Sequence, residues 1–83
     1  MNTLLEHISQ QHFLTIEGVI DALKNCLVAG GYFAKDSAFD GIRDEAQNPM
    51  IYKNIVVEGQ EGLCCLKVFI RHHNTYTVTA YIL

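Results

Sequence analysis

The sequence predicts an α+β domain, with helices in its first half and an antiparallel sheet in its last third. Two observations lead to this prediction. Apolar residues recur at the helical period over residues 16–28, and three strand-like segments follow residue 49. Short turn-like segments separate the three, which favours consecutive antiparallel strands. We expect two N-terminal helices, plus a short third, packed on a three-stranded antiparallel C-terminal meander.

The two main helices are expected over residues 2–12 and from Ile16 to about Val28. Thr15 is a suitable N-cap for the second helix. Gly30-Gly31 ends that helix, because glycine reaches the left-handed conformation without strain.

A short third helix is expected over Ala38–Gln47, since residues 32–49 would otherwise form a long structureless connection. Ser37 is its predicted cap, and Asp40 occupies the capping-box position. Asn48-Pro49 ends any helix and begins the first strand.

The first hairpin joins MIYKNIVVE to LCCLKVFIR through the loop Gly59–Gly62, which sets Glu58 opposite Leu63. In the second hairpin, a loop of His72-His73-Asn74 sets Arg71 opposite Thr75, with Asn74 in the left-handed position. A two-residue loop would mix the two faces of the sheet, so we reject it.

This register sorts the strand side chains into two faces, because successive side chains alternate. One face is aliphatic apart from Lys53, and we expect helices to cover it: Ile51, Ile55, Val57, Cys64, Leu66, Val68, Ile70, Val78, Ala80 and Ile82. The opposite face is mixed: Tyr52, Asn54, Val56, Cys65, Lys67, Phe69, Arg71, Thr77, Thr79 and Tyr81. A polar row crosses the mixed face as Asn54–Lys67–Thr79, with Tyr81 and Arg71 nearby.

The composition bounds the class of protein. Eighty-three residues make one domain, 1–83, and a hydrophobic content of 49% indicates a globular chain. The net charge of −3, without a basic run, argues against binding to nucleic acid through the overall field. The three cysteines have no scaffold spacing, so we expect reduced thiols and a cytoplasmic site of action. We expect no membrane span and no signal peptide, and secretion as part of a larger protein stays open.

Lys67 is the first candidate site residue. A lysine on the central strand, flanked by Thr79 and Asn54, is able to hold a phosphate, with Tyr81 orienting it. The alternative is a solvated sheet face whose polar groups resist edge aggregation.

His7 and His12 are the candidate general acid and base, because imidazole exchanges protons near neutral pH. The alternative is one histidine at the core edge and one in solvent. His72 and His73 lie in a predicted turn without further ligands at metal-binding spacing, so we expect neither a metal nor a cofactor.

Short motifs along most of the chain resemble the superfamily of small nucleases that includes barnase, EndoU, colicin and RelE-like toxins. The motifs are "HI…H", "LTIEGVIDAL", "NPMIYKNIVV", "GLCCLKVFIR" and "YTVTAY". The resemblance implies helices on an antiparallel sheet and metal-independent cleavage of RNA. It also implies a site of His7 or His12, Lys67 or Arg71, and Thr79 with Tyr81.

Two hypotheses for the function follow. The first is a metal-independent ribonuclease of toxin type, with RNA as substrate, a neutralising protein as partner, and Asn54 and Arg71 binding the substrate. The second is a non-catalytic interaction module, an immunity, antitoxin or regulatory protein, that forms a homodimer through the mixed sheet face.

Overall fold

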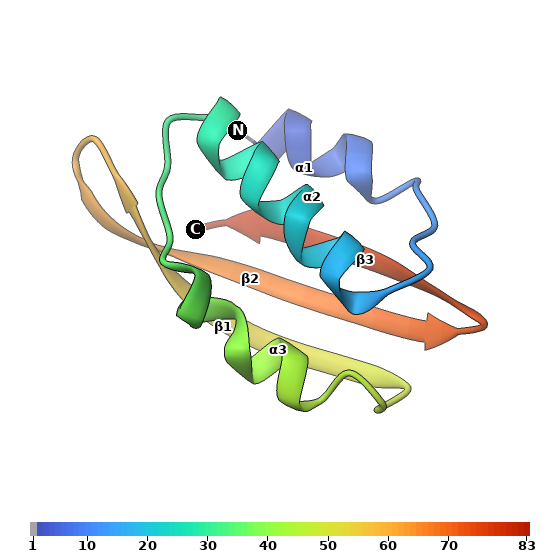
Figure 1. The fold of residues 1–83 in the computed structure, drawn as a ribbon. Coiled ribbons are helices and arrows are strands. Elements are labelled where there is room, and N and C mark those ends of the chain that lie inside the picture. Colours follow the sequence, from blue (N-terminus) through green and yellow to red (C-terminus); the bar gives the residue numbers. More distant parts are fainter. Residues whose placement is uncertain (1) are drawn as a thin grey trace.

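The computed structural model describes residues 2–83 and arranges them in two layers, with the helices on one face of the sheet (Figure 1). The elements are α1 (Asn2–Ile8), α2 (Ile16–Ala29), the 3-10 turn η1 (Asp36–Phe39), α3 (Asp40–Asp44), β1 (Met50–Gly59), β2 (Gly62–His73) and β3 (Thr75–Ile82). The strands lie in the order β1-β2-β3, and neighbouring strands are antiparallel. The predicted α+β fold is therefore confirmed.

The first helix is shorter than predicted, because a turn follows Ile8 and the chain then pairs with the sheet at Phe13. α1 ends at Ile8, and Phe13 forms an isolated antiparallel bridge with Tyr76 of β3. The Phe13 N–H donates to the Tyr76 carbonyl at 2.9 Å, and the Tyr76 N–H donates to the Phe13 carbonyl at 2.8 Å. This pairing requires extended backbone on both sides. The prediction of a helix through residue 12 is wrong, and His12 lies beside the sheet.

The ends of α2 match the sequence prediction. The Thr15 hydroxyl accepts a hydrogen bond from the Gly18 N–H at 3.0 Å, as an N-cap does. At the other end, Gly31 has a φ of 83°, and the Tyr32 N–H donates to the Leu27 carbonyl at 2.8 Å. Glycine is needed at this left-handed position, because a side chain would strain it.

The third helix differs from the prediction in its bounds and in its cap. The chain forms η1 and then α3, and η1 begins after Lys35 without a side-chain cap. The carboxylate of Asp40 does not close a capping box, because it accepts a hydrogen bond from Arg43 at 2.9 Å. The predicted apolar face is retained, since Phe39 and Ile42 are fully buried.

The first hairpin has the predicted register, with Glu58 opposite Leu63 and Ile51 opposite Ile70. The second hairpin does not. Arg71 lies opposite Thr77, not Thr75, so the pairing is shifted by two residues along β3.

A tighter turn at the end of β2 explains the shift in the second hairpin. His72 pairs with Tyr76, and their rings stack at 3.9 Å with an angle of 11° between the planes. Asn74 is left-handed, as predicted, with a φ of 66°. Because a shift of two keeps the alternation of side chains, every residue stays on its predicted face.

The core lies between the sheet and the helices. α1 and α2 pack over β3, while η1 and α3 pack over β1, so the third helix covers a part of the sheet that the first two leave free (Figure 1). The aliphatic strand face is buried except for half-buried Lys53, Cys64 and Ile82. Lys53 pairs with the Glu45 carboxylate just after α3. This pair places the charged end of Lys53 at the margin of the core.

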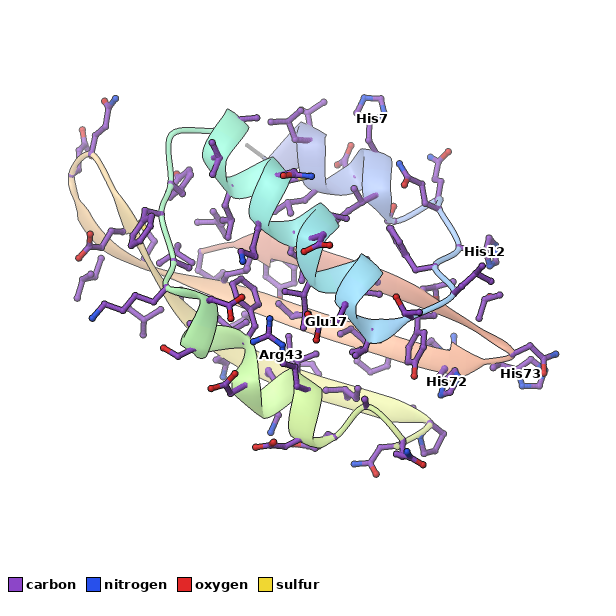
Figure 2. The ribbon with its side chains drawn as sticks, in the orientation of Figure 1. His7, His12, Glu17, Arg43, His72 and His73 are labelled. Atoms are coloured by element: carbon purple, nitrogen blue, oxygen red, sulfur yellow. The ribbon has the colours of Figure 1, made fainter. Side chains whose placement is uncertain are left out.

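Arg43 of α3 ties the helical layer together (Figure 2). Its guanidinium donates to both carboxylate oxygens of Glu17 in α2, at 2.8 and 3.1 Å. It also donates to the Asp36 carboxylate at 2.8 Å, and Lys24 binds the same carboxylate oxygen at 2.8 Å. Bidentate arginine pairs of this kind fix the geometry of their partners. Arg43 therefore holds η1 and α3 against α2.

We expect Leu66→Ala to lower the free energy of unfolding by about 2–5 kcal/mol, because Leu66 is fully buried on β2. Val56→Ala is the matched control on the opposite face of the sheet, and it should cost less than about 1 kcal/mol. Urea unfolding followed by circular dichroism measures both. Equal losses would contradict the assignment of faces.

The ion pairs around Arg43 lead us to expect that the folded state loses stability in acid. Hydrogen bonds from Arg43 and Lys24 lower the pKa of Asp36 from its ordinary 3.8 to about 2. The carboxylate of Asp36 therefore stabilises the fold fully above about pH 4, and this contribution disappears as the pH falls through about 2.

Arg43→Gln should flatten the fall in stability between pH 4 and pH 2, because its Asp36 keeps a pKa nearer the unfolded value. Urea midpoints measured across this range test the expectation. Lys35→Gln is the control, since it removes a nearby exposed cation that has no ion pair within residues 2–83. If the urea midpoints of Arg43→Gln and of the unchanged chain differed by the same amount at every pH, the expectation would be refuted.

Candidate functional site

The face of the sheet opposite the helices is free of helical cover over residues 2–83 (Figure 1). We call it the open face. It consists of the even-numbered residues Met50 to Glu58 of β1 and the odd-numbered residues Leu63 to Tyr81 of β2 and β3. Several of its apolar side chains are exposed, including Tyr52, Val56, Leu63 and Tyr81. A sheet face of this size and composition is available to a ligand or to another chain.

A cavity of about 330 Å³ lies at the end of the open face where β2 turns into β3. We call it the turn pocket. Its lining consists of two imidazoles, one guanidinium and two hydroxyls: His12, Arg71, His73, Thr75 and Thr77. Figure 2 shows His12 and His73 at the same end of the molecule.

The fold brings the lining residues together through two independent pairings. The register of β2 and β3 sets Arg71 beside Thr77 and His73 beside Thr75. The bridge between Phe13 and Tyr76 adds residue 12 at the outer edge of β3. Because Phe13 packs against the core, the neighbouring His12 side chain falls on the open side. Nδ1 of His12 lies 3.0 Å from the Thr75 hydroxyl oxygen.

The two consecutive histidines of β2 occupy different environments. His73 lines the turn pocket, whereas His72 faces the helical layer and stacks on Tyr76. The Tyr76 hydroxyl in turn donates to the Ala46 carbonyl at 3.0 Å. His72 therefore anchors the turn, and His73 is free to meet a ligand.

The charges are unevenly distributed between the two layers. Seven of the nine acidic residues lie between residues 6 and 45, on the helices and their connections, and the other two are Glu58 and Glu61 at the first hairpin. Lys24, Arg43 and Lys53 are bound by acidic residues of the helical half. Within residues 2–83, Lys67 and Arg71 form no ion pair, and both belong to the open face. Away from the first hairpin, the open face is therefore cationic, although the whole chain has a net negative charge.

Aromatic rings occupy the middle of the open face. Tyr52 and Phe69 pair across β1 and β2 in an edge-to-face contact, with centroids 6.0 Å apart and planes at 65°. Tyr81 lies opposite Lys67, which in turn lies opposite Asn54. We call Tyr52, Phe69 and Tyr81 the aromatic band.

The structure divides the predicted site residues into three groups. His12 and Arg71 meet in the turn pocket. Lys67, Tyr81 and Asn54 form one row across the three strands, while Thr79 lies opposite Phe69. The predicted row Asn54–Lys67–Thr79 is therefore corrected, and its third member is Tyr81. His7 is exposed on α1 and points away from the sheet (Figure 2).

These positions exclude a shared phosphate between His12 and Lys67. His12 contacts Thr75, and Lys67 pairs with Tyr81, six residues further along β3. Six residues of antiparallel strand span about 20 Å. One phosphate group cannot bridge this gap, so the two groups of residues serve separate positions.

His73, Thr75 and Thr77 were missed by the sequence reasoning. The sequence prediction puts His73 in a loop, where side chains do not alternate between two faces. Its register also sets Thr75 opposite Arg71, in place of Thr77. The available signal was the run of odd-numbered polar residues at 71, 73, 75 and 77, which a tighter turn places on one face.

Other reactive groups have structural explanations. The Cys26 thiol donates to the Leu4 carbonyl at 3.5 Å, and burial raises its pKa, which keeps it protonated and unreactive. No group of three His, Cys, Asp or Glu side chains within residues 2–83 has the arrangement of a metal site. The helices of this same range are too short or too polar to cross a membrane.

Comparison with known proteins identifies no relative. No protein-family model matches the chain, and no match is found among the curated proteins or the solved structures.

Proposed function

We propose that the chain is a metal-independent ribonuclease whose active site is the turn pocket. The observation that carries this proposal is the meeting of two imidazoles, a guanidinium and two hydroxyls in one open cavity. Cleavage of RNA by its own 2′-hydroxyl needs a general base, a general acid and a cation for the phosphate. The turn pocket supplies each of these groups. The resemblance to small toxin nucleases supports the same reaction class.

Arg71 and Thr77 hold the scissile phosphate, since they are paired across β2 and β3 and both face the cavity. A guanidinium forms two parallel hydrogen bonds to phosphate oxygens. It therefore stabilises the extra charge that these oxygens gain when a fifth oxygen binds to phosphorus.

His12 acts as the base. The Thr75 hydroxyl holds Nδ1 of His12, which leaves Nε2 to accept the proton of the 2′-hydroxyl. The 2′-oxygen then attacks phosphorus, and the bond from phosphorus to the 5′-oxygen breaks. His73 gives its proton to the leaving 5′-oxygen. The products are a 2′,3′-cyclic phosphate and a free 5′-hydroxyl.

The charge distribution supports an anionic substrate in spite of the net charge of −3. Acidic residues lie mainly on the helical side, whereas Arg71 and Lys67 on the open face form no ion pair with any residue from 2 to 83. A local field of this kind attracts a polyanion to one surface of an acidic protein.

The purified chain should cleave total RNA in the presence of EDTA and leave cyclic phosphate ends. His12→Ala and Arg71→Ala should each lower the rate at least about 100-fold, because each removes a group needed in the transition state. His7→Ala is the matched control: it removes an exposed histidine of α1 that points away from the sheet, and it should leave the rate unchanged. Gel assays of a labelled RNA measure the rates.

Intact RNA at high protein concentration would refute the proposal. Equal loss of activity in His7→Ala and His12→Ala would refute the location of the site. Circular dichroism of each variant separates a lost reaction from a lost fold.

A second candidate function is self-association through the open face, as a non-catalytic interaction module. The observation that favours it is the exposed apolar group at the end near the first hairpin, where Val56 is 63% and Leu63 71% exposed. A second copy is the partner that fits, because the open face carries acidic Glu58 near this end and Arg71 at the other. A two-fold axis through the face sets opposite charges against each other.

Under this second candidate, light scattering should find a dimer, and Phe69→Glu should convert it to a monomer by burying a charge at the centre of the face. Val28→Glu is the control, since Val28 is exposed on α2 in the helical layer. A monomer at all concentrations, or equal dissociation by both substitutions, would exclude this candidate.

A further inference from the structure

Along the central strand, the open face alternates cations and a ring. Arg71, Phe69 and Lys67 are successive side chains on this face of β2, about 7 Å apart. Single-stranded nucleic acids present a similar alternation of phosphates and bases. Proteins that bind them combine a cationic track with aromatic side chains on which bases stack.

The rings of the aromatic band are available for such stacking. Tyr52 is 59% and Tyr81 44% exposed, although both lie on a sheet whose other face is the core. The edge-to-face contact with Phe69 holds Tyr52 at a fixed position beside the central strand. A small apolar cavity of about 30 Å³ lies between Tyr52, Lys67, Phe69, Thr79 and Tyr81. It marks a hollow in the middle of the face.

We propose that the open face binds single-stranded RNA along β2, with a base stacked on the aromatic band beside the cleaved phosphate. The location of that phosphate rests on the proposed function, since Arg71 is the cation of the turn pocket. Lys67 binds a phosphate further along the strand, and Asn54, next to Lys67 on β1, reaches the edge of a base. The separation of Lys67 from the turn pocket is thus explained by two positions on one substrate.

This arrangement selects against double-stranded RNA. In a duplex the bases are paired and stacked inside the helix, so no base face is available to Tyr52 or Tyr81. A duplex would contact only Arg71 and Lys67 through its phosphates. The selectivity for single strands therefore comes from the rings, and the salt dependence of binding comes from the cations.

The test measures binding and cleavage separately. Binding uses the full chain carrying His12→Ala, which slows cleavage under the proposed function. The ligand is a fluorescently labelled RNA of mixed sequence, either single-stranded or annealed to its complement. We expect tighter binding of the single strand. Adding Tyr52→Leu should weaken single-strand binding about tenfold, because stacking on one ring is lost. Adding Tyr52→Phe should preserve it, since the ring remains.

Lys67→Gln provides a second, independent readout. It should lower the slope of log Kd against log salt concentration by about one, because one phosphate contact is lost. Lys24→Gln is the matched control, a cation of α2 that pairs with Asp36 in the helical layer, and it should leave the slope unchanged.

The proposal is overturned if the duplex binds as tightly as the single strand, or if Tyr52→Leu and Tyr52→Phe bind alike. It is also overturned if single-stranded and duplex RNA are cleaved at equal rates and Tyr52→Leu does not change either rate. In that case the proposal that the chain cleaves RNA still stands. If the RNA stays intact but binding of the single strand depends on the Tyr52 ring, the cleavage proposal is refuted. The proposal that a base stacks on the aromatic band then stands.

Discussion

The pairing of Phe13 with Tyr76 is the constraint on which the arrangement of this molecule depends. Its two backbone hydrogen bonds join the segment after α1 to the outer edge of β3. They end the first helix, place His12 on the open side of the sheet, and hold Tyr76 under the helical layer. Tyr76 then stacks with His72 and donates to the carbonyl of Ala46. One pair of residues thus couples the helical layer, the second turn and the candidate site.

The two layers have separate tasks. The helical layer holds most of the acidic residues and uses them around Arg43 and Lys53, where they fix the short third helix against α2 and β1. The open face holds Lys67 and Arg71 without partners among residues 2–83. Strand alternation makes this division possible, because neighbouring residues of one strand belong to different layers. His72 and His73 show the result, since one anchors the turn and the other lines the turn pocket.

The sequence was sufficient for the fold class, the faces of the sheet and the caps of α2, because these depend on local periodicity and on glycine or threonine at particular positions. It was insufficient for the second register. A tighter turn at Asn74, with His73 opposite Thr75, has the same parity and keeps Asn74 left-handed, so alternation cannot distinguish the two. The end of α1 was also missed, since the pairing of Phe13 with Tyr76 is a long-range contact that no local pattern reveals.

The candidate site was predicted in part for the same reasons. Arg71, Lys67, Tyr81 and Asn54 were placed on the correct face by parity alone. His12 reached that face only through the pairing of Phe13, and His73 only through the tight turn. A site assembled from three separate segments depends on tertiary contacts that a sequence pattern leaves undetermined.

The separation of charge between the two layers makes the molecule electrostatically asymmetric. Its helical side is repelled by any extended polyanion, while the sheet is drawn toward it, so the protein turns in the field before the surfaces touch. Most encounters of a small acidic protein with such a partner would begin with the wrong side forward. Under the proposed function, this electrostatic torque would turn the three strands toward the polyanion.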